Sequence, residues 1–253
     1  MKHSKKILAA SVALALALPC AAIAQDDSDA YHLAIVHAKL DRIPEFQAGM
    51  EAYSNCLAEN DGDNAFSVWR SLNGDRTSFH IVNRFDNWAE MDEDSPSSEA
   101  CWGNDEIRDG VFDNMASWKT SYATKMPEWS GDAEDYTVVQ LHNFRISEGD
   151  NFRAVVGEIM GYVKEAEYEH APDWFNVMPG GYGQAHMFAV SHYANFAAMD
   201  EDRPGVMGIL EEQVGEERAE QLWDAWRDAM EDEKGYWRET LVLQPSMGYS
   251  PDD

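Results

Sequence analysis

The chain has 253 residues, of which 44% are hydrophobic and 11% aromatic, and its formal net charge is −28. This length and composition exclude a disordered chain and allow one or two hydrophobic cores. The sequence supplies no basic footprint for phosphates, so nucleic acid and anionic membrane surfaces are not expected as partners. We interpret the acidic composition as solubility in a salty medium, typical of a marine or halotolerant bacterium.

The first 24 residues have the pattern of a signal peptide. Lysines give a positive start, residues 7–18 form an apolar run, and Ala-Ile-Ala at 22–24 matches a cleavage site. The apolar run is too short for a comfortable membrane-spanning helix, and no later segment approaches the roughly 20 apolar residues that a span needs. We therefore expect residues 1–24 to be removed and the mature protein to be periplasmic or secreted in a Gram-negative bacterium, without membrane insertion.

Strand and helix patterns alternate after the signal peptide. An apolar, β-branched run at Asp29–Leu40 predicts a strand, and apolar residues spaced by three and four over Ile43–Leu57 predict a helix. Two short runs, Phe66–Trp69 and Phe79–Phe85, flank a glycine-containing turn and predict a hairpin. A second helical region and a last strand follow.

The second half of the chain repeats this order. Ser78–Pro96 aligns without a gap on His186–Pro204, which makes the protein a tandem duplication. We also align the first strand with Glu134–Arg145, which matches His37 to His142. The last strand of the second copy is clearest at Glu239–Gln244.

Each copy therefore has the order β-α-β-β-α-β, typical of a ferredoxin-like unit with a four-stranded antiparallel sheet and helices on one face. A lone unit would leave its other sheet face bare, and a large apolar patch is normally covered by a partner. We predict an α+β fold in which two tandem ferredoxin-like units pack their antiparallel sheets together as an intrachain α/β barrel. The first repeat spans residues 29–130, the second spans 134–246, and a flexible tail spans 247–253.

This arrangement resembles the dimeric α/β-barrel superfamily. The resemblance rests on the order of elements, the duplication and the segment NRFDNWAEMDED at residues 83–94. The superfamily includes antibiotic-biosynthesis-monooxygenase-like proteins, heme-degrading monooxygenases and, in fused tandem form, chlorite dismutases. Resemblance to the heme-degrading members implies an asparagine and a tryptophan beside a heme, and Asn83 and Trp88 lie in the comparable segment.

The second helical regions contain no histidine. Both heme-binding groups of the superfamily hold iron through a histidine on a helix, so the resemblance does not extend to that ligand. We therefore predict no cofactor, and heme stays as an option without support from a helical histidine.

Two cysteines follow the signal peptide, Cys56 at the end of the first predicted helix and Cys101 near the start of the second. These helices run antiparallel in a ferredoxin-like unit, so the two residues are expected to lie close together. We predict a disulfide between them in an oxidising compartment. Two buried free thiols are the alternative.

The acidic segment Met-Asp-Glu-Asp occurs in both copies, at 91–94 and 199–202. It lacks the alternating oxygen ligands and the glycine of a calcium loop, so we predict no metal site. Asp94 and Asp202 instead stand shortly before a proline and are predicted to cap the following helices.

Candidate chemistry lies on the first strand of each copy. Alternation across a sheet places Ile35 and His37 on one face, and the aligned strand places Val138, Gln140 and His142 on the matching face. The opposite faces are apolar and suit the helices. We therefore expect these two sets to face the space between the sheets.

Two histidines related by pseudo-twofold symmetry in an apolar space make a candidate site, because histidine can act as a base, a hydrogen-bond donor or an iron ligand. His37 and His142 are our catalytic candidates. Histidines bonded to backbone or water are the alternative. The other expected pocket residues are Gln140, Ile35, Val138, Asn83, Trp88, His80, His186 and His192.

The sequence favours an exported antibiotic-biosynthesis-monooxygenase-like barrel that acts on or binds a small apolar organic molecule between the two repeats. A non-catalytic periplasmic ligand-binding or stress-associated barrel is the alternative, and a heme-binding protein is the third candidate. The expected partner is a small molecule. The chain is expected to be a monomeric pseudo-dimer or to assemble further as a homo-oligomer.

Overall fold

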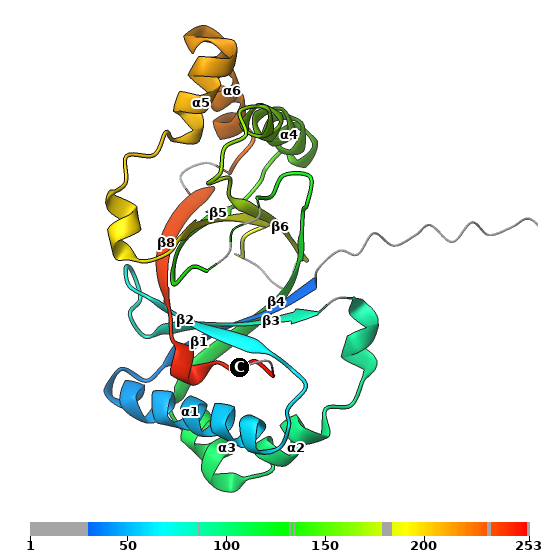
Figure 1. Cartoon of the computed structure of the whole chain (residues 1–253), viewed down its shortest axis with the longest axis vertical. Helices are drawn as coiled ribbons and strands as arrows, with labels where there is room; N and C mark the ends of the chain where they lie inside the picture. The colour runs from blue at the N-terminus through cyan, green and yellow to red at the C-terminus, as the bar shows by residue number, and fades with distance from the viewer. Residues whose placement is uncertain are drawn as a thin grey trace, which may run out of the picture.

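Eight strands form one closed antiparallel barrel in the computed structural model of the chain (Figure 1). The structure describes residues 30–85, 87–131, 133, 135–178, 184–231 and 234–251. The expected signal peptide, residues 1–24, lies outside the described residues. No helix within these described ranges is both long enough and apolar enough to span a membrane.

The first half of the chain supplies four strands and three helices. Its elements are β1 (Ala30–Ala38), α1 (Ile43–Glu59), β2 (Phe66–Ser71), β3 (Ser78–Phe85), α2 (Pro96–Trp102), α3 (Asp105–Phe112) and β4 (Met115–Lys125). The second half repeats this order. Its elements are β5 (Val138–Phe144), α4 (Gly149–Glu165), β6 (Asp173–Met178), β7 (Met187–Tyr193), α5 (Val206–Val214), α6 (Glu216–Asp228) and β8 (Tyr236–Leu243).

The predicted fold is confirmed, and the second helical region of each half is divided into two helices. The strand order is β4-β1-β3-β2 in the first half and β8-β5-β7-β6 in the second. The barrel closes where β2 pairs with β8 and where β4 pairs with β6. These two seams are equivalent, so the halves are related by a pseudo-twofold axis along the barrel.

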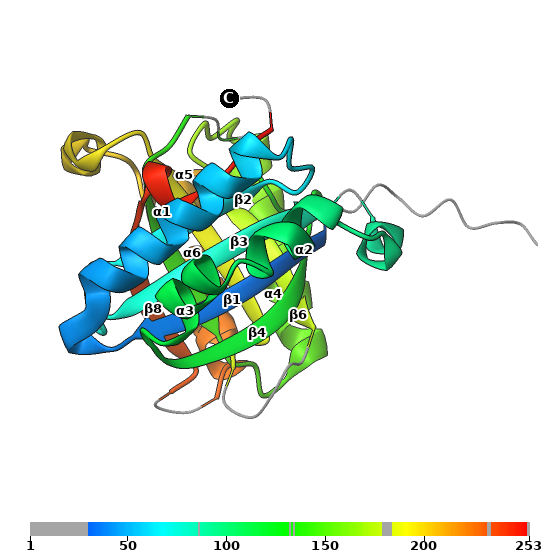
Figure 2. The same ribbon diagram turned by 90° about the horizontal axis from the view of Figure 1, so that it is seen from below.

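The helices cover the outside of the barrel on two opposite sides, α1 to α3 over the first sheet and α4 to α6 over the second (Figures 1 and 2). Each layer between helices and sheet has its own core. The first core includes Phe46, Met50 and Phe79, and the second includes Phe152 and Met160. All five side chains are at most 2% exposed.

Helix α1 packs its apolar face on the sheet and approaches α3 closely. A side-chain carbon at Gly49 would lie 2.5 Å from the backbone carbon of Gly110. This contact is too short for any larger residue, so Gly49 sets the distance between the two helices.

A disulfide joins Cys56 on α1 to Cys101 on α2, with 5.9 Å between the Cα atoms. The predicted pairing is therefore confirmed. The bond ties together two helices that lie on the same side of the barrel (Figure 2).

The acidic segments begin with short 3-10 helices, η2 (Trp88–Asp92) and η3 (Phe196–Asp200). Asn87 and Asn195 cap them, accepting hydrogen bonds from the backbone N–H groups of Ala89 and Ala198. The expected caps at Asp94 and Asp202 are therefore wrong: α2 follows Ser95, and α5 begins only after Gly205. The repeated asparagine caps the 3-10 helices, and α2 and α5 begin without a side-chain cap hydrogen bond.

The end of the chain packs on the first half and is not a loose tail over its described part. Met247 is 1% exposed, and Tyr249 pairs with the backbone of Phe66. The Tyr249 hydroxyl donates a hydrogen bond of 2.8 Å to the carbonyl of Gly62. We expected flexibility from residue 247 onward because the sequence did not show that Met247 and Tyr249 pack on the first half. Burial of these two side chains offsets the loss of chain entropy.

Candidate functional site

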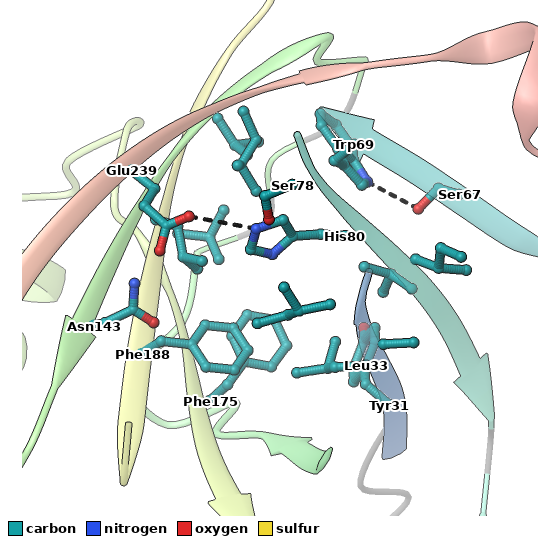
Figure 3. A pocket seen from close by; sticks show the side chains of 18 of the residues that line it. Tyr31, Leu33, Ser67, Trp69, Ser78, His80, Asn143, Phe175, Phe188 and Glu239 are labelled. Carbon is teal, nitrogen blue, oxygen red and sulfur yellow. Dashed lines mark hydrogen bonds and ion pairs between the residues drawn. The ribbon is translucent and has the colours of Figure 1, made fainter. Parts of the chain in front are cut away.

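The inside of the barrel holds a cavity of about 880 Å³. Alternate residues of all eight strands point into it, because side chains alternate across a sheet. Its middle is a belt of apolar side chains contributed by both halves: Leu33, Val82, Leu141, Phe175, Phe188 and Val190. Phe175 stacks on Phe188 with ring centroids 4.7 Å apart, and Figure 3 shows the two rings below His80.

The first strand of the first half points as the sequence suggested. Leu33, Ile35 and His37 line the cavity, whereas Val36 belongs to the core under α1. Tyr31 follows the same alternation and lies edge-on to Phe175, at 5.2 Å between ring centroids.

The first strand of the second half points the other way from our expectation. Val139, Leu141 and Asn143 line the cavity, and Val138, Gln140 and His142 lie on the outer face of β5. The sequence alignment matched His37 to His142. The strand pairing instead makes Ile35 equivalent to Asn143, because Ile35 lies opposite His80 and Asn143 lies opposite Phe188, and His80 and Phe188 are matched positions of the repeat. An odd shift in register exchanges the two faces of a strand.

His142 therefore lies outside the cavity. Its Nδ1 is 2.8 Å from the hydroxyl of Tyr236, and its Nε2 is 3.3 Å from the hydroxyl of Ser191. Burial lowers the pKa of His142 to about 4, and the nearby charge of Arg238 adds to this. The ring is neutral near pH 7 and connects three strands of the second sheet.

The central polar feature of the cavity is a pair formed by His80 on β3 and Glu239 on β8. The His80 Nε2 lies 3.4 Å from a carboxylate oxygen of Glu239, and these side chains are 10% and 26% exposed. Figure 3 shows both groups reaching into the cavity from opposite walls. Because β3 belongs to the first half and β8 to the second, the pair exists only when the two halves form one barrel.

The facing imidazole of His80 lowers the pKa of Glu239 against the opposing effect of burial. The indole N–H of Trp237 donates a hydrogen bond of 3.1 Å to the other carboxylate oxygen. Glu239 is therefore an ionised carboxylate held inside a largely apolar space, and it can orient His80 and stabilise its protonated form.

A second ion pair lies at the same end of the cavity. His37 Nδ1 is 3.0 Å from Asp75, whose pKa is lowered mainly by hydrogen bonds from Thr77. We call this part of the cavity the His80 end; it contains His80, Glu239, His37, Asp75 and Asn143.

The opposite end, which we call the His192 end, contains His192, Asp173, Lys125 and Tyr136. Asp173 lies 3.0 Å from Lys125 and 3.4 Å from His192. Burial lowers the pKa of His192 to about 4, and Lys125 adds to this. The Tyr136 ring packs on His192 at 4.2 Å, and burial raises the pKa of Tyr136. This end is thus a compact group with one neutral histidine and one neutralised carboxylate.

Three other expected pocket residues lie outside the cavity. Asn83 and Trp88 are on the helix side of the first sheet, where Trp88 meets Tyr122 at 5.6 Å. His186 accepts a hydrogen bond of 2.9 Å from the backbone N–H of Ile146. Of the expected residues, Ile35, His37, His80 and His192 line the cavity.

Sequence reasoning missed Glu239, Asn143 and Asp173. The sequence could have indicated Glu239, because it is a carboxylate at the start of the apolar last strand, where side chains alternate between the two faces of the sheet. Asn143 could have been found from the repeat. The third strands of the two copies align with an offset of 108 residues, and the same offset applied to the first strands matches Ile35 to Asn143.

The residues do not fit a heme held between a sheet and a helical histidine. Within the part of the chain that the structure describes, helices α1 to α6 contain no histidine. Moreover, Phe46, Phe79 and Phe152, each 0% exposed, fill the layers between helices and sheets. Among the described residues no group of three His, Cys, Asp or Glu side chains is arranged to hold a metal ion.

No protein-family model and no curated protein matches the sequence. Solved structures match the fold. A candidate monooxygenase from Lactobacillus acidophilus aligns over 88% of this chain and 97% of its own, with 12% identity and a TM-score of 0.51. An anthrone oxidase-like protein aligns over 87% of this chain and 92% of its own, with 9% identity and a TM-score of 0.51. At these identities the similarity shows the fold alone, a closed eight-stranded α+β barrel.

Proposed function

We propose that this protein is an antibiotic-biosynthesis-monooxygenase-like enzyme that binds a small, mostly apolar organic molecule inside the barrel and acts on it with His80. The observation that carries the proposal is the His80–Glu239 pair, which stands in an apolar cavity of about 880 Å³. Cavities of this size and lining are typical of small-molecule sites.

The pair suits the removal of a proton from a bound substrate. His80 has its Nε2 toward Glu239, and its ring projects into the cavity (Figure 3). A carboxylate behind an imidazole fixes the ring and stabilises the imidazolium that forms when the ring accepts a proton. The apolar belt excludes water, so the resulting substrate anion would meet dioxygen rather than solvent.

A substrate anion can donate an electron to dioxygen, so this chemistry needs no further reductant. For a reacting CH₂ group the overall change is CH₂ plus O₂ to C=O plus water. The name of the anthrone oxidase-like neighbour suggests a suitable probe, 1,8-dihydroxy-9-anthrone, which this reaction converts to the anthraquinone.

The test is dioxygen consumption together with anthraquinone absorbance, measured for the wild type and for His80→Gln and Glu239→Gln. We expect turnover to fall by about 100-fold or more in His80→Gln, the usual size of a general-base contribution. His142→Gln is the matched control, since His142 lies on the outer face of the same barrel. A wild type that binds the anthrone without consuming dioxygen would refute catalysis on this probe and support the ligand-binding alternative.

Export is part of the proposal. The disulfide between Cys56 and Cys101 supports it, because such bonds persist in oxidising compartments. The intact mass of protein from the periplasm tests it: we expect a chain that begins at Gln25, and an uncleaved chain in the cytoplasm would contradict it.

A further inference from the structure

Three buried polar atoms at the His80 end have no hydrogen-bond partner among the described residues. They are His80 Nε2, Asn143 Nδ2 and Gln184 Oε1. All three residues line the cavity, and His80 and Asn143 are only 8% and 6% exposed. The His80 Nε2 lies 3.4 Å from Glu239, which is longer than an ordinary N–H···O hydrogen bond, so this contact does not satisfy the nitrogen.

Strand pairing places Asn143 on the wall that carries Glu239, and His80 reaches toward this wall from the opposite one. Asn143 lies opposite Trp237 and Phe188, and the preceding inward residue, Leu141, lies opposite Glu239. Figure 3 shows the Asn143 amide below Glu239, on the side that His80 faces. Gln184 precedes β7 and lines the same cavity.

A buried polar atom that is left unpaired destabilises the folded protein. Such atoms are retained where a bound ligand supplies the missing hydrogen-bond partner. Asn143 offers an amide N–H donor and Gln184 a carbonyl acceptor. If both amides rotate by 180°, their roles are exchanged and the site still presents one donor and one acceptor.

We propose that Asn143 and Gln184 bind a neutral ligand edge that has a donor and an acceptor on adjacent atoms, as in a carboxamide or lactam, in the part of the cavity that His80 faces. The edge accepts a hydrogen bond from Asn143 and donates one to Gln184. Neutrality follows from Glu239, an ionised carboxylate on the same wall that repels a carboxylate ligand. This inference rests on the proposed function, since it concerns the ligand of the same cavity.

The test compares three probes with one apolar body: 2-naphthamide, naphthalene and 2-naphthoate. Dissociation constants are measured by fluorescence titration of the whole mature protein. We expect 2-naphthamide to bind about 10- to 100-fold more tightly than either other probe, the value of completing buried polar groups.

Asn143→Leu should abolish this preference for 2-naphthamide over naphthalene. It should also raise the midpoint of thermal unfolding, because it removes a buried unpaired amide. Gln140→Leu is the matched control, as Gln140 lies on the same strand and faces outward. Gln184→Leu is a second variant, outside the strands, and should also lower the preference.

The outcomes separate the two proposals. Equal binding of all three probes, or tighter binding of 2-naphthoate, would overturn the carboxamide edge and leave the apolar cavity intact. Failure of all three probes to bind would refute the proposed function itself. A lower unfolding midpoint together with a retained preference in Asn143→Leu would assign Asn143 a purely structural role.

Discussion

Burial of His192 makes the stability of the fold depend on pH in a predictable direction. The side chain is 6% exposed, and its pKa falls from 6.5 to about 4 in the folded protein. The carboxylate of Asp173 lies 3.4 Å away and would favour a charged ring, but Lys125 already neutralises it at 3.0 Å. Desolvation therefore decides the direction.

The unfolded chain takes up a proton on this histidine below about pH 6.5, whereas the folded chain does not do so until about pH 4. Stability is therefore fully present above pH 6.5 and falls as the pH drops through this range. The full loss corresponds to about 3 kcal/mol, of which about 2 kcal/mol is lost by pH 5.

The assay is urea unfolding of the wild type and of His192→Gln at pH 7.5 and pH 5. Glutamine keeps a donor toward Asp173 but cannot titrate, so the difference between the two pH values should shrink by about 2 kcal/mol. His170→Gln, an exposed loop substitution, is the control and should leave the difference unchanged. An unchanged pH dependence in His192→Gln would refute the reasoning.

Three further predictions concern the framework. Replacing Cys56 and Cys101 by serine should lower the free energy of unfolding by roughly 2–4 kcal/mol in chemical denaturation; no change would mean that the bond does not form in solution. Gly49→Ala should destabilise the protein by about 1–3 kcal/mol, because the new side-chain carbon would collide with the backbone of α3. Gly161→Ala is the control and should be neutral or slightly stabilising, because open space surrounds Gly161. Equal effects of the two substitutions in thermal unfolding would contradict the close approach of α1 and α3. The pKa of Glu239 is lowered in the folded protein, so its ionised form stabilises the fold above its unfolded pKa, and this contribution is lost as the pH falls through the folded value. In Glu239→Gln the free energy of unfolding should therefore decrease less at acidic pH than in the wild type. An unchanged decrease would count against the interaction of Glu239 with His80.

The architecture could be predicted from the sequence because the duplication and the order of patterns constrain it together. Two copies of a β-α-β-β-α-β order leave few ways to bury both sheet faces, and the barrel is the one observed. The pairing of Cys56 with Cys101 followed from the same topology.

The candidate site was only partly predictable, for a reason that is specific to strands. Ile35, His37, His80 and His192 line the cavity. On β5, however, an alignment that was three residues out of register reversed the faces and selected His142 in place of Asn143. Val139 and Leu141 are the more apolar set and were assigned to the helices, but the cavity is itself apolar and these residues line it. The His80–Glu239 pair depends on a contact between the two halves, which no local pattern encodes.

The central claim is that the ligand binds inside the barrel, and a pair of adjacent substitutions on β5 tests it most directly. Leu141 faces the cavity, whereas its neighbour Gln140 faces outward. The measurement is the fluorescence titration of naphthalene binding to the wild type, Leu141→Trp and Gln140→Trp, with folding checked by circular dichroism. We predict one bound probe per chain in the wild type and Gln140→Trp and no binding in folded Leu141→Trp. Unchanged binding in Leu141→Trp would place the ligand elsewhere and contradict the account.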